Sequence, residues 1–103
     1  MNTEEQIEKL NRAADRRAAL IILTEGFARD PRVWVHVDLV RERIQFKAIL
    51  ENGTFSSGER CLLQATASLF NQEYSVNLWE IFDSLDDRNA GLVLKAIESF
   101  CRF

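Results

Sequence analysis

Ser56-Ser57-Gly58-Glu59 has the sequence of a helix start, and two similar stretches follow it. In each, a short polar side chain precedes a helical pattern and can accept a hydrogen bond from the first free backbone N–H groups of the helix. The first stretch also has Glu three residues after Ser, which is the pattern of a capping box. The other two starts are Asn77-Leu78-Trp79-Glu80 and Asp86-Asp87-Arg88-Asn89. Residues 55–103 are therefore predicted to form three helices, the first ending near residue 70 and the second near residue 84.

The residues before this run predict a long N-terminal helix. Thr3 and Gln6 fit a second capping box, and apolar residues recur at helical spacing from Ile7 to Ile21. The pattern predicts a helix from about residue 4 to residue 27. Its apolar face widens over residues 18–23, so we expect its second half to be buried on more than one side.

Residues 32–50 fit two secondary structures. Alternate apolar residues from Val33 to Leu39 are typical of a strand, whereas apolar residues spaced by three and four from Val33 to Ala48 fit one helix face. Asp30-Pro31 is a typical helix start, no Gly or Asn-Gly turn interrupts the run, and Asn52-Gly53 is a helix stop. We therefore favour one helix over residues 32–51, with a pair of strands within residues 32–50 as the alternative.

These elements predict an all-α fold, a small antiparallel bundle of about five helices joined by short loops. The alternative for residues 32–50 would make the fold α+β. The chain has 103 residues, of which 47% are hydrophobic, so residues 1–103 are expected to form a single domain around one core.

Several short motifs of the second half occur in a recognisable order. They are Phe55-Ser56-Ser57-Gly58-Glu59-Arg60, Leu69-Phe70-Asn71, Val76, Leu78-Trp79 and Leu85-Asp86-Asp87-Arg88-Asn89. Together they resemble the C-terminal part of short bacterial proteins of unassigned function, over about half of the chain. The resemblance implies a bacterial origin and a helical tail, and it implies no activity, ligand or catalytic residue.

The charge of the chain is divided unevenly between its two halves. The formal net charge is −3; residues 1–50 carry nine Lys/Arg and eight Asp/Glu, whereas residues 51–103 carry four and eight. Because nucleic-acid phosphates are bound by clustered cations, nucleic acid is an unfavoured partner, and only the Arg-bearing first half suits it. The acidic N-terminal residues and the short apolar run over residues 18–23 predict a cytoplasmic protein without a membrane partner.

Cys61 is the candidate for a reactive thiol. We expect it in the first turn of a helix, where the helix dipole lowers the pKa of a thiol, and Arg60 is adjacent. A small apolar core residue beside Leu62 is the favoured interpretation, since most free cysteines are of that kind. The single histidine, His36, has no obvious partner, and the acidic residues at 80–87 lack the spacing of a calcium loop. We predict no catalytic, metal or cofactor site, and no enzyme.

Aromatic residues exceed what so small a bundle is expected to bury. Trp34, Phe46, Phe100 and Phe103 are the candidates for an exposed apolar surface, which marks a partner or a self-association site. We predict a non-enzymatic interaction or regulatory protein that acts through an apolar helical face, with a homodimer as one form. The alternative is a nucleic-acid-binding regulator that uses the Arg-bearing first half.

Overall fold

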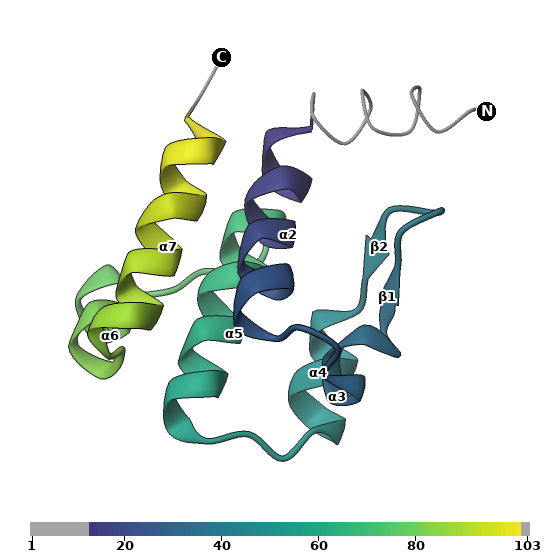
Figure 1. The fold of residues 1–103 in the computed structure, drawn as a ribbon, viewed down its shortest axis with the longest axis horizontal. Helices are drawn as coiled ribbons and strands as arrows, with labels where there is room; N and C mark the ends of the chain where they lie inside the picture. Colours follow the sequence, from purple (N-terminus) through teal and green to yellow (C-terminus); the bar gives the residue numbers. More distant parts are fainter. Residues whose placement is uncertain (1–12, 102–103) are drawn as a thin grey trace.

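The computed structural model describes residues 13–101, which form a mostly helical fold with one short hairpin (Figure 1). The elements in chain order are α2 (Ala14–Gly26), α3 (Pro31–Trp34), β1 (Val37–Asp38), β2 (Arg43–Ile44), α4 (Phe46–Asn52), α5 (Ser57–Phe70), α6 (Leu78–Ser84) and α7 (Asp87–Phe100). The small, mostly helical bundle predicted from the sequence is confirmed. The predicted helix start at Thr3 lies outside the described residues, and the prediction of one helix over residues 4–27 is wrong, because Ala13 is extended and α2 begins at Ala14.

Helix α5 lies at the centre of the fold. It packs against α2, α4, α6 and α7, while α2 packs mainly against α7 and α5 (Figure 1). Helix α2 is therefore buried on two sides, which confirms the prediction from its widened apolar face. The buried side chains of these three helices include Ala18, Ile22 and Leu23 from α2, Leu62, Leu63 and Thr66 from α5, and Val93 and Ala96 from α7.

The three predicted helix starts in the second half are confirmed by their capping hydrogen bonds. Before α5, the Ser56 hydroxyl accepts from the backbone N–H of Glu59 at 3.2 Å, and the Glu59 carboxylate accepts from the backbone N–H of Ser56 at 2.9 Å. Asn77 caps α6 and Asp86 caps α7 in the same way, each accepting from the backbone N–H three residues later. These local bonds fix where each helix begins.

The predicted helix over residues 32–51 is wrong, and the alternative of a strand pair within residues 32–50 is present instead. Only the ends of this stretch are helical, as α3 and α4. Between them β1 pairs antiparallel with β2, with Val37 opposite Ile44. These two side chains share a face of the hairpin and pack against the core. Of the alternating apolar residues from Val33 to Leu39, Val37 is the one that lies in a strand, while Val35 and Leu39 are exposed.

The turn of the hairpin forms without a glycine. Glu42 has a φ of 57°, a left-handed conformation that glycine usually supplies, and its carboxylate lies 3.4 Å from the guanidinium of Arg16 on α2. On the other side of the turn, the Asp38 carboxylate accepts a hydrogen bond from the backbone N–H of Arg41 at 3.0 Å. Side chains hold this turn, so it forms without a glycine. The lack of a glycine in this stretch therefore did not indicate a continuous helix.

Arg32 connects the start of α3 to the start of α5. Its guanidinium donates to Asp30 at 2.6 Å and to Glu59 at 3.0 Å, and it lies 4.4 Å from the centre of the Phe55 ring. The hydrogen bond from Arg32 lowers the pKa of Asp30. The pKa of Glu59 is lowered first by the backbone N–H of Ser56 and further by Arg32. One cation thus joins two helix caps that are far apart in the sequence.

Candidate functional site

The aromatic residues predicted to form an exposed surface are not brought together. Phe46 is only 1% exposed, and its ring packs against Phe70 and Tyr74 with centroid distances of 5.6 and 6.2 Å. The prediction of an exposed Phe46 is wrong, because this residue begins α4 on the side that faces α5.

The other three candidates differ from one another. Trp34 is half-buried, and its indole N–H donates to the backbone carbonyl of Phe27 at 2.7 Å. Phe100 is 41% exposed in the last turn of α7. Phe103 lies outside the described residues. Of the four, Phe100 alone is shown as a substantially exposed apolar side chain.

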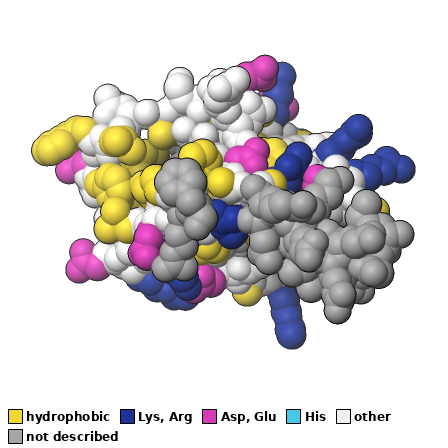
Figure 2. Space-filling view, turned by 90° about the horizontal axis from the view of Figure 1, so that it is seen from above, with side chains coloured by type: hydrophobic (Ala, Val, Ile, Leu, Met, Phe, Trp, Pro, Cys, Tyr) yellow, Lys and Arg dark blue, Asp and Glu magenta, His cyan; other side chains and the backbone are white. Residues whose placement is uncertain are grey.

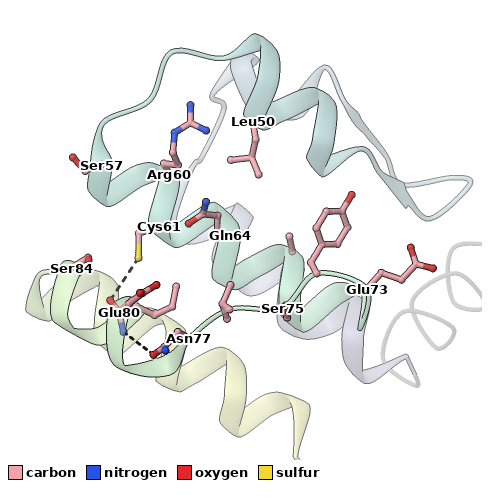
Figure 3. A pocket seen from close by; sticks show the side chains of 14 residues that line it. Leu50, Ser57, Arg60, Cys61, Gln64, Glu73, Ser75, Asn77, Glu80 and Ser84 are labelled. Carbon is pink, nitrogen blue, oxygen red and sulfur yellow. Dashed lines mark hydrogen bonds between the residues drawn. The ribbon is translucent and has the colours of Figure 1, made fainter.

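Cys61 lacks the surroundings of a reactive thiol. It lies four residues after Ser57, beyond the first turn of α5, and is 7% exposed. Its thiol lies 3.7 Å from the backbone carbonyl of Ile81, toward which it points (Figure 3). Burial raises the pKa of the Cys61 thiol, the charge of Glu80 raises it further, and a hydrogen bond with Ser84 opposes them. The structure therefore favours the core interpretation, since the thiolate is the reactive form.

An open groove of about 610 Å³ runs along α5 beside Cys61 (Figure 3). Leu50 of α4 and Glu80 of α6 stand on opposite sides of it, Arg60 and Gln64 project from α5, and residues 73–77 close one end. No histidine is among the described residues that line this groove, and histidine is the usual base beside a nucleophilic cysteine. Within residues 13–101, no group of three or more His, Cys, Asp and Glu side chains is placed to hold a metal ion.

Exposed large apolar side chains occur on α6 and α7, at one end of the longest axis of the molecule, and around the hairpin, toward the other end (Figure 1). Leu78 and Trp79 are adjacent on α6 and are called the helical patch, while Leu94 and Phe100 are exposed on α7. Leu39 and Val40 are adjacent in the turn between β1 and β2 and are called the hairpin patch, while Val35 is exposed before β1. Exposed tryptophan is enriched at protein interfaces.

Acidic side chains border the helical patch. Trp79 lies one turn before Asp83, so its side chain has a carboxylate on its own helix face. Residues 78–100 carry five Asp/Glu and two Lys/Arg. One of the two cations, Lys95, is bonded to Glu25 of α2 at 2.8 Å. Residues 78–100 therefore carry a net negative charge.

Basic side chains border the hairpin patch. Residues 29–47 carry five Lys/Arg and three Asp/Glu. All three of these carboxylates face cations of the chain itself: Asp30 faces Arg32, Asp38 faces Arg41 and Glu42 faces Arg16. Four cations of this segment are exposed, namely Arg29, Arg41, Arg43 and Lys47. Figure 2 shows the contrast, with hydrophobic side chains gathered at the end that holds α6 and α7 and long Lys/Arg side chains projecting at the other.

Comparison of the chain with protein-family models, with curated proteins and with solved structures finds no match. The resemblance to short bacterial proteins, the bacterial origin and the cytoplasmic location therefore stay predictions. Among the described helices, none has both the length and the apolar character needed to cross a lipid bilayer.

Sequence reasoning missed Trp79, the most exposed aromatic residue of the helical patch. The feature of the sequence that could have predicted the exposure of Trp79 is the short length of the helix that follows Asn77. Helix α6 buries Ile81, and a helix of seven residues with one buried position leaves Leu78 and Trp79 on its outer side. A cap identifies where a helix begins, and the length of that helix then limits how many apolar residues it can bury.

Proposed function

We propose that this chain is a non-enzymatic interaction protein that binds a protein partner through the helical patch. The observation that carries the proposal is Trp79, which is 78% exposed while Ile81 of the same helix is packed into the core. A large aromatic side chain contributes more than most residues to the free energy of a protein interface once it is buried in a partner.

The helical patch is also held in place before any partner binds. Asn77 caps α6, and Ile81 and Leu85 anchor the helix against the core. A preformed surface loses little conformational entropy on binding, so more of its contact energy appears as affinity. An apolar centre with charged residues around it matches the general composition of protein interfaces. Self-association of this chain is the simplest form of such binding.

The proposal is tested by placing a photoreactive benzoyl-phenylalanine at position 79 in the full chain. The matched control carries the same group at Glu51, an exposed residue of α4 outside both patches. We expect protein adducts from position 79, identified by mass spectrometry, to exceed those from position 51 after irradiation in cells. Equal yields at the two positions would show that the helical patch binds no protein.

A second candidate function is nucleic-acid binding through the first half of the chain. The exposed cations around the hairpin patch favour it, because phosphate groups are bound by such clusters. Fluorescence anisotropy of a labelled DNA duplex checks this candidate. We expect binding that weakens steeply with salt and is lost when Arg41 and Arg43 are both changed to Gln. A duplex that stays free at low salt would exclude it.

A further inference from the structure

Residues 31–52 fold as a helix, a hairpin and a helix, although their sequence also suits one continuous helix. Asp30 caps the start, α4 ends at Asn52 before Gly53, and residues 32–52 contain no Gly or Pro. We propose that this stretch can straighten into one helix, and that two copies of the chain then exchange the elements on either side of it as a domain-swapped dimer. This inference does not depend on the helical patch and goes beyond the proposed function.

The part that would change shape is residues 35–45, which we call the hinge. Each of its residues is half-buried or exposed, and its two strands are two residues long each. Val35 still has the helical φ and ψ of −64° and −19°, so α3 is already extended by one residue. Glu42 has the left-handed φ of 57°, which is unfavourable for a residue with a Cβ. Straightening therefore gives up a short hairpin and the contact of Glu42 with Arg16, and it relieves the left-handed residue.

The main contacts of the fold join elements before the hinge to elements after it, so a second copy can supply them. Helix α2 packs on α5 and α7, on the far side of the hinge in the sequence (Figure 1). Two ion pairs do the same, Arg32 with Glu59 at 3.0 Å and Lys95 with Glu25 at 2.8 Å. In the swapped dimer, α2 and α3 of one copy pack on α4–α7 of the other through these same contacts. Exchange of identical elements costs little for this reason.

Straightening the hinge also creates an apolar face that the hairpin lacks. Val37, Val40 and Ile44 are spaced by three and four residues, so they share one face of a continuous helix. In the hairpin, Val37 and Ile44 pack against the core while Val40 is 83% exposed. In a twofold dimer the two hinge helices can pack through this face, which gives Val40 an apolar neighbour. The second copy thus offsets the loss of the hairpin.

Two substitutions at one position of the full chain test the hinge. Glu42→Gly and Glu42→Ala both remove the carboxylate that faces Arg16, so they differ only in backbone preference. Glycine suits the left-handed φ of the turn and disfavours a helix, whereas alanine strains the turn and favours a helix. The matched controls are Glu51→Gly and Glu51→Ala, because Glu51 lies in α4 and is helical in both forms.

Each chain is unfolded in urea, refolded at high concentration and separated by size exclusion with light scattering. A reductant is present throughout, because Cys101 is exposed and could form a disulfide. We expect wild-type monomer and dimer to elute separately, because exchange requires α2 to leave the core. The association constant of the refolded mixture should be lower for Glu42→Gly than for Glu42→Ala by roughly tenfold or more. The two Glu51 variants should have similar association constants.

A cross-link within the wild-type chain reports the exchange directly. A carbodiimide condenses a neighbouring amine and carboxylate into an amide, and Lys95 and Glu25 are placed for it at 2.8 Å. Unlabelled and heavy-isotope chains are refolded together in equal amounts, and the cross-linked peptides are identified by mass spectrometry. In the dimer fraction, peptide pairs of mixed isotope should be as frequent as pairs of one isotope. In the monomer fraction, every pair should be of one isotope.

Other results would overturn the inference and are distinguishable from failure of the proposed function. A dimer whose Lys95–Glu25 links all carry one isotope would be formed by folded surfaces, as self-association through the helical patch would be. A chain that stays monomeric after refolding, with Glu42→Ala included, would exclude the swap, while adducts from position 79 would still decide the proposed function. Mixed-isotope links with equal association constants for the two Glu42 variants would place the exchange at another segment.

Discussion

Residues 56–101 and residues 31–52 are held in their structures by different kinds of interaction. In residues 56–101, each helix begins at a side chain that caps it. In residues 31–52, the two strands are only two residues long and are held by contacts with the rest of the fold. Ser56, Asn77 and Asp86 bond to backbone groups three residues away. The hairpin is held by the burial of Val37 and Ile44 and by the contact of Glu42 with Arg16. The first region is specified locally and the second by its surroundings.

This difference shows where the fold is expected to open first. A segment with few internal hydrogen bonds and short elements can unfold without the rest of the domain. We expect amide hydrogens of residues 37–44 to exchange before those of α5. The following predictions test the contrast, from the largest expected effect to the smallest.

Phe46→Ala should have the largest effect, because Phe46 anchors residues 31–52 in the core. Its ring is 1% exposed and contacts Phe70 and Tyr74. Removing a buried phenylalanine costs about 3–5 kcal/mol of unfolding free energy, measured by urea denaturation. Val40→Ala, at an exposed position of the same segment, should cost no more than about 0.5 kcal/mol. Similar losses for the two variants would mean that the hairpin region is not held by the core.

Arg32→Met should lower the unfolding free energy at neutral pH by less than Phe46→Ala does. It should also make the unfolding free energy depend less on pH in the acidic range. Arg32 is the main cause of the lowered pKa of Asp30, and it adds to the effect of the Ser56 backbone N–H, which is the main cause of the lowered pKa of Glu59; the ordinary values are 3.8 and 4.5. A carboxyl group with a lowered folded pKa stabilises the fold above its ordinary pKa, and this stabilisation is lost as the pH falls through the folded value.

Urea denaturation between about pH 5 and pH 2 measures this effect. The wild-type chain should lose stability on acidification more steeply than Arg32→Met, because the pKa of Asp30 returns toward its ordinary value in the variant, while the Ser56 backbone N–H still lowers the pKa of Glu59. Arg88→Met, which removes an exposed cation of α7, is the control and should follow the wild-type profile. Parallel profiles for Arg32→Met and the wild-type chain would show that Arg32 does not link the two regions.

Ser56→Ala tests the local specification of residues 56–101. It removes the hydroxyl that accepts from the Glu59 N–H, and the loss of such a cap costs about 1 kcal/mol. Ser57→Ala, one residue along, is the control and should cost less than about 0.5 kcal/mol. Thermal or urea unfolding measures both. Equal values at the two serines would argue that the start of α5 is fixed by packing.

Arg29→Gly should give the smallest change, and in the opposite direction. Arg29 lies in the junction between α2 and α3 with a φ of 58°, a conformation that is strained for any residue with a Cβ. Glycine relieves this strain but has more freedom in the unfolded chain, so the net gain should be at most about 1 kcal/mol. Arg29→Ala keeps the strain and should give no gain. A gain from alanine equal to that from glycine would assign the effect to charge instead.

Prediction from the sequence succeeded for features that are determined by interactions between residues close together in the chain. The starts at Ser56, Asn77, Asp86 and Asp30 were all predicted, because a cap and the N–H groups it satisfies are neighbours in the sequence. Residues 32–50 were assigned to the wrong element because their apolar spacing fits a helix and a strand alike. The deciding contacts, such as that between Arg16 and Glu42, join residues far apart in the chain.

The candidate site was predicted less well than the fold. Which aromatic side chain is exposed depends on how helices are oriented around α5, and no local pattern records that orientation. Phe46 was expected at the surface and lies in the core, whereas Phe100 is exposed as expected. Composition indicated correctly that some apolar side chains would face solvent, but Trp79 could be identified only from the short length of α6.

The packing of α2 against α7 has a consequence for how the protein is made. Residues 14–26 are synthesised before their main neighbour, residues 87–100, which follows them across the rest of the described fold. Until then the apolar face around Ala18 and Ile22 has no cover, and the guanidinium of Arg17 lacks the carbonyl and hydroxyl of Ser99 to which it donates. A ribosome that stalls before residue 87 would thus release a chain with an open core, which quality-control chaperones would bind.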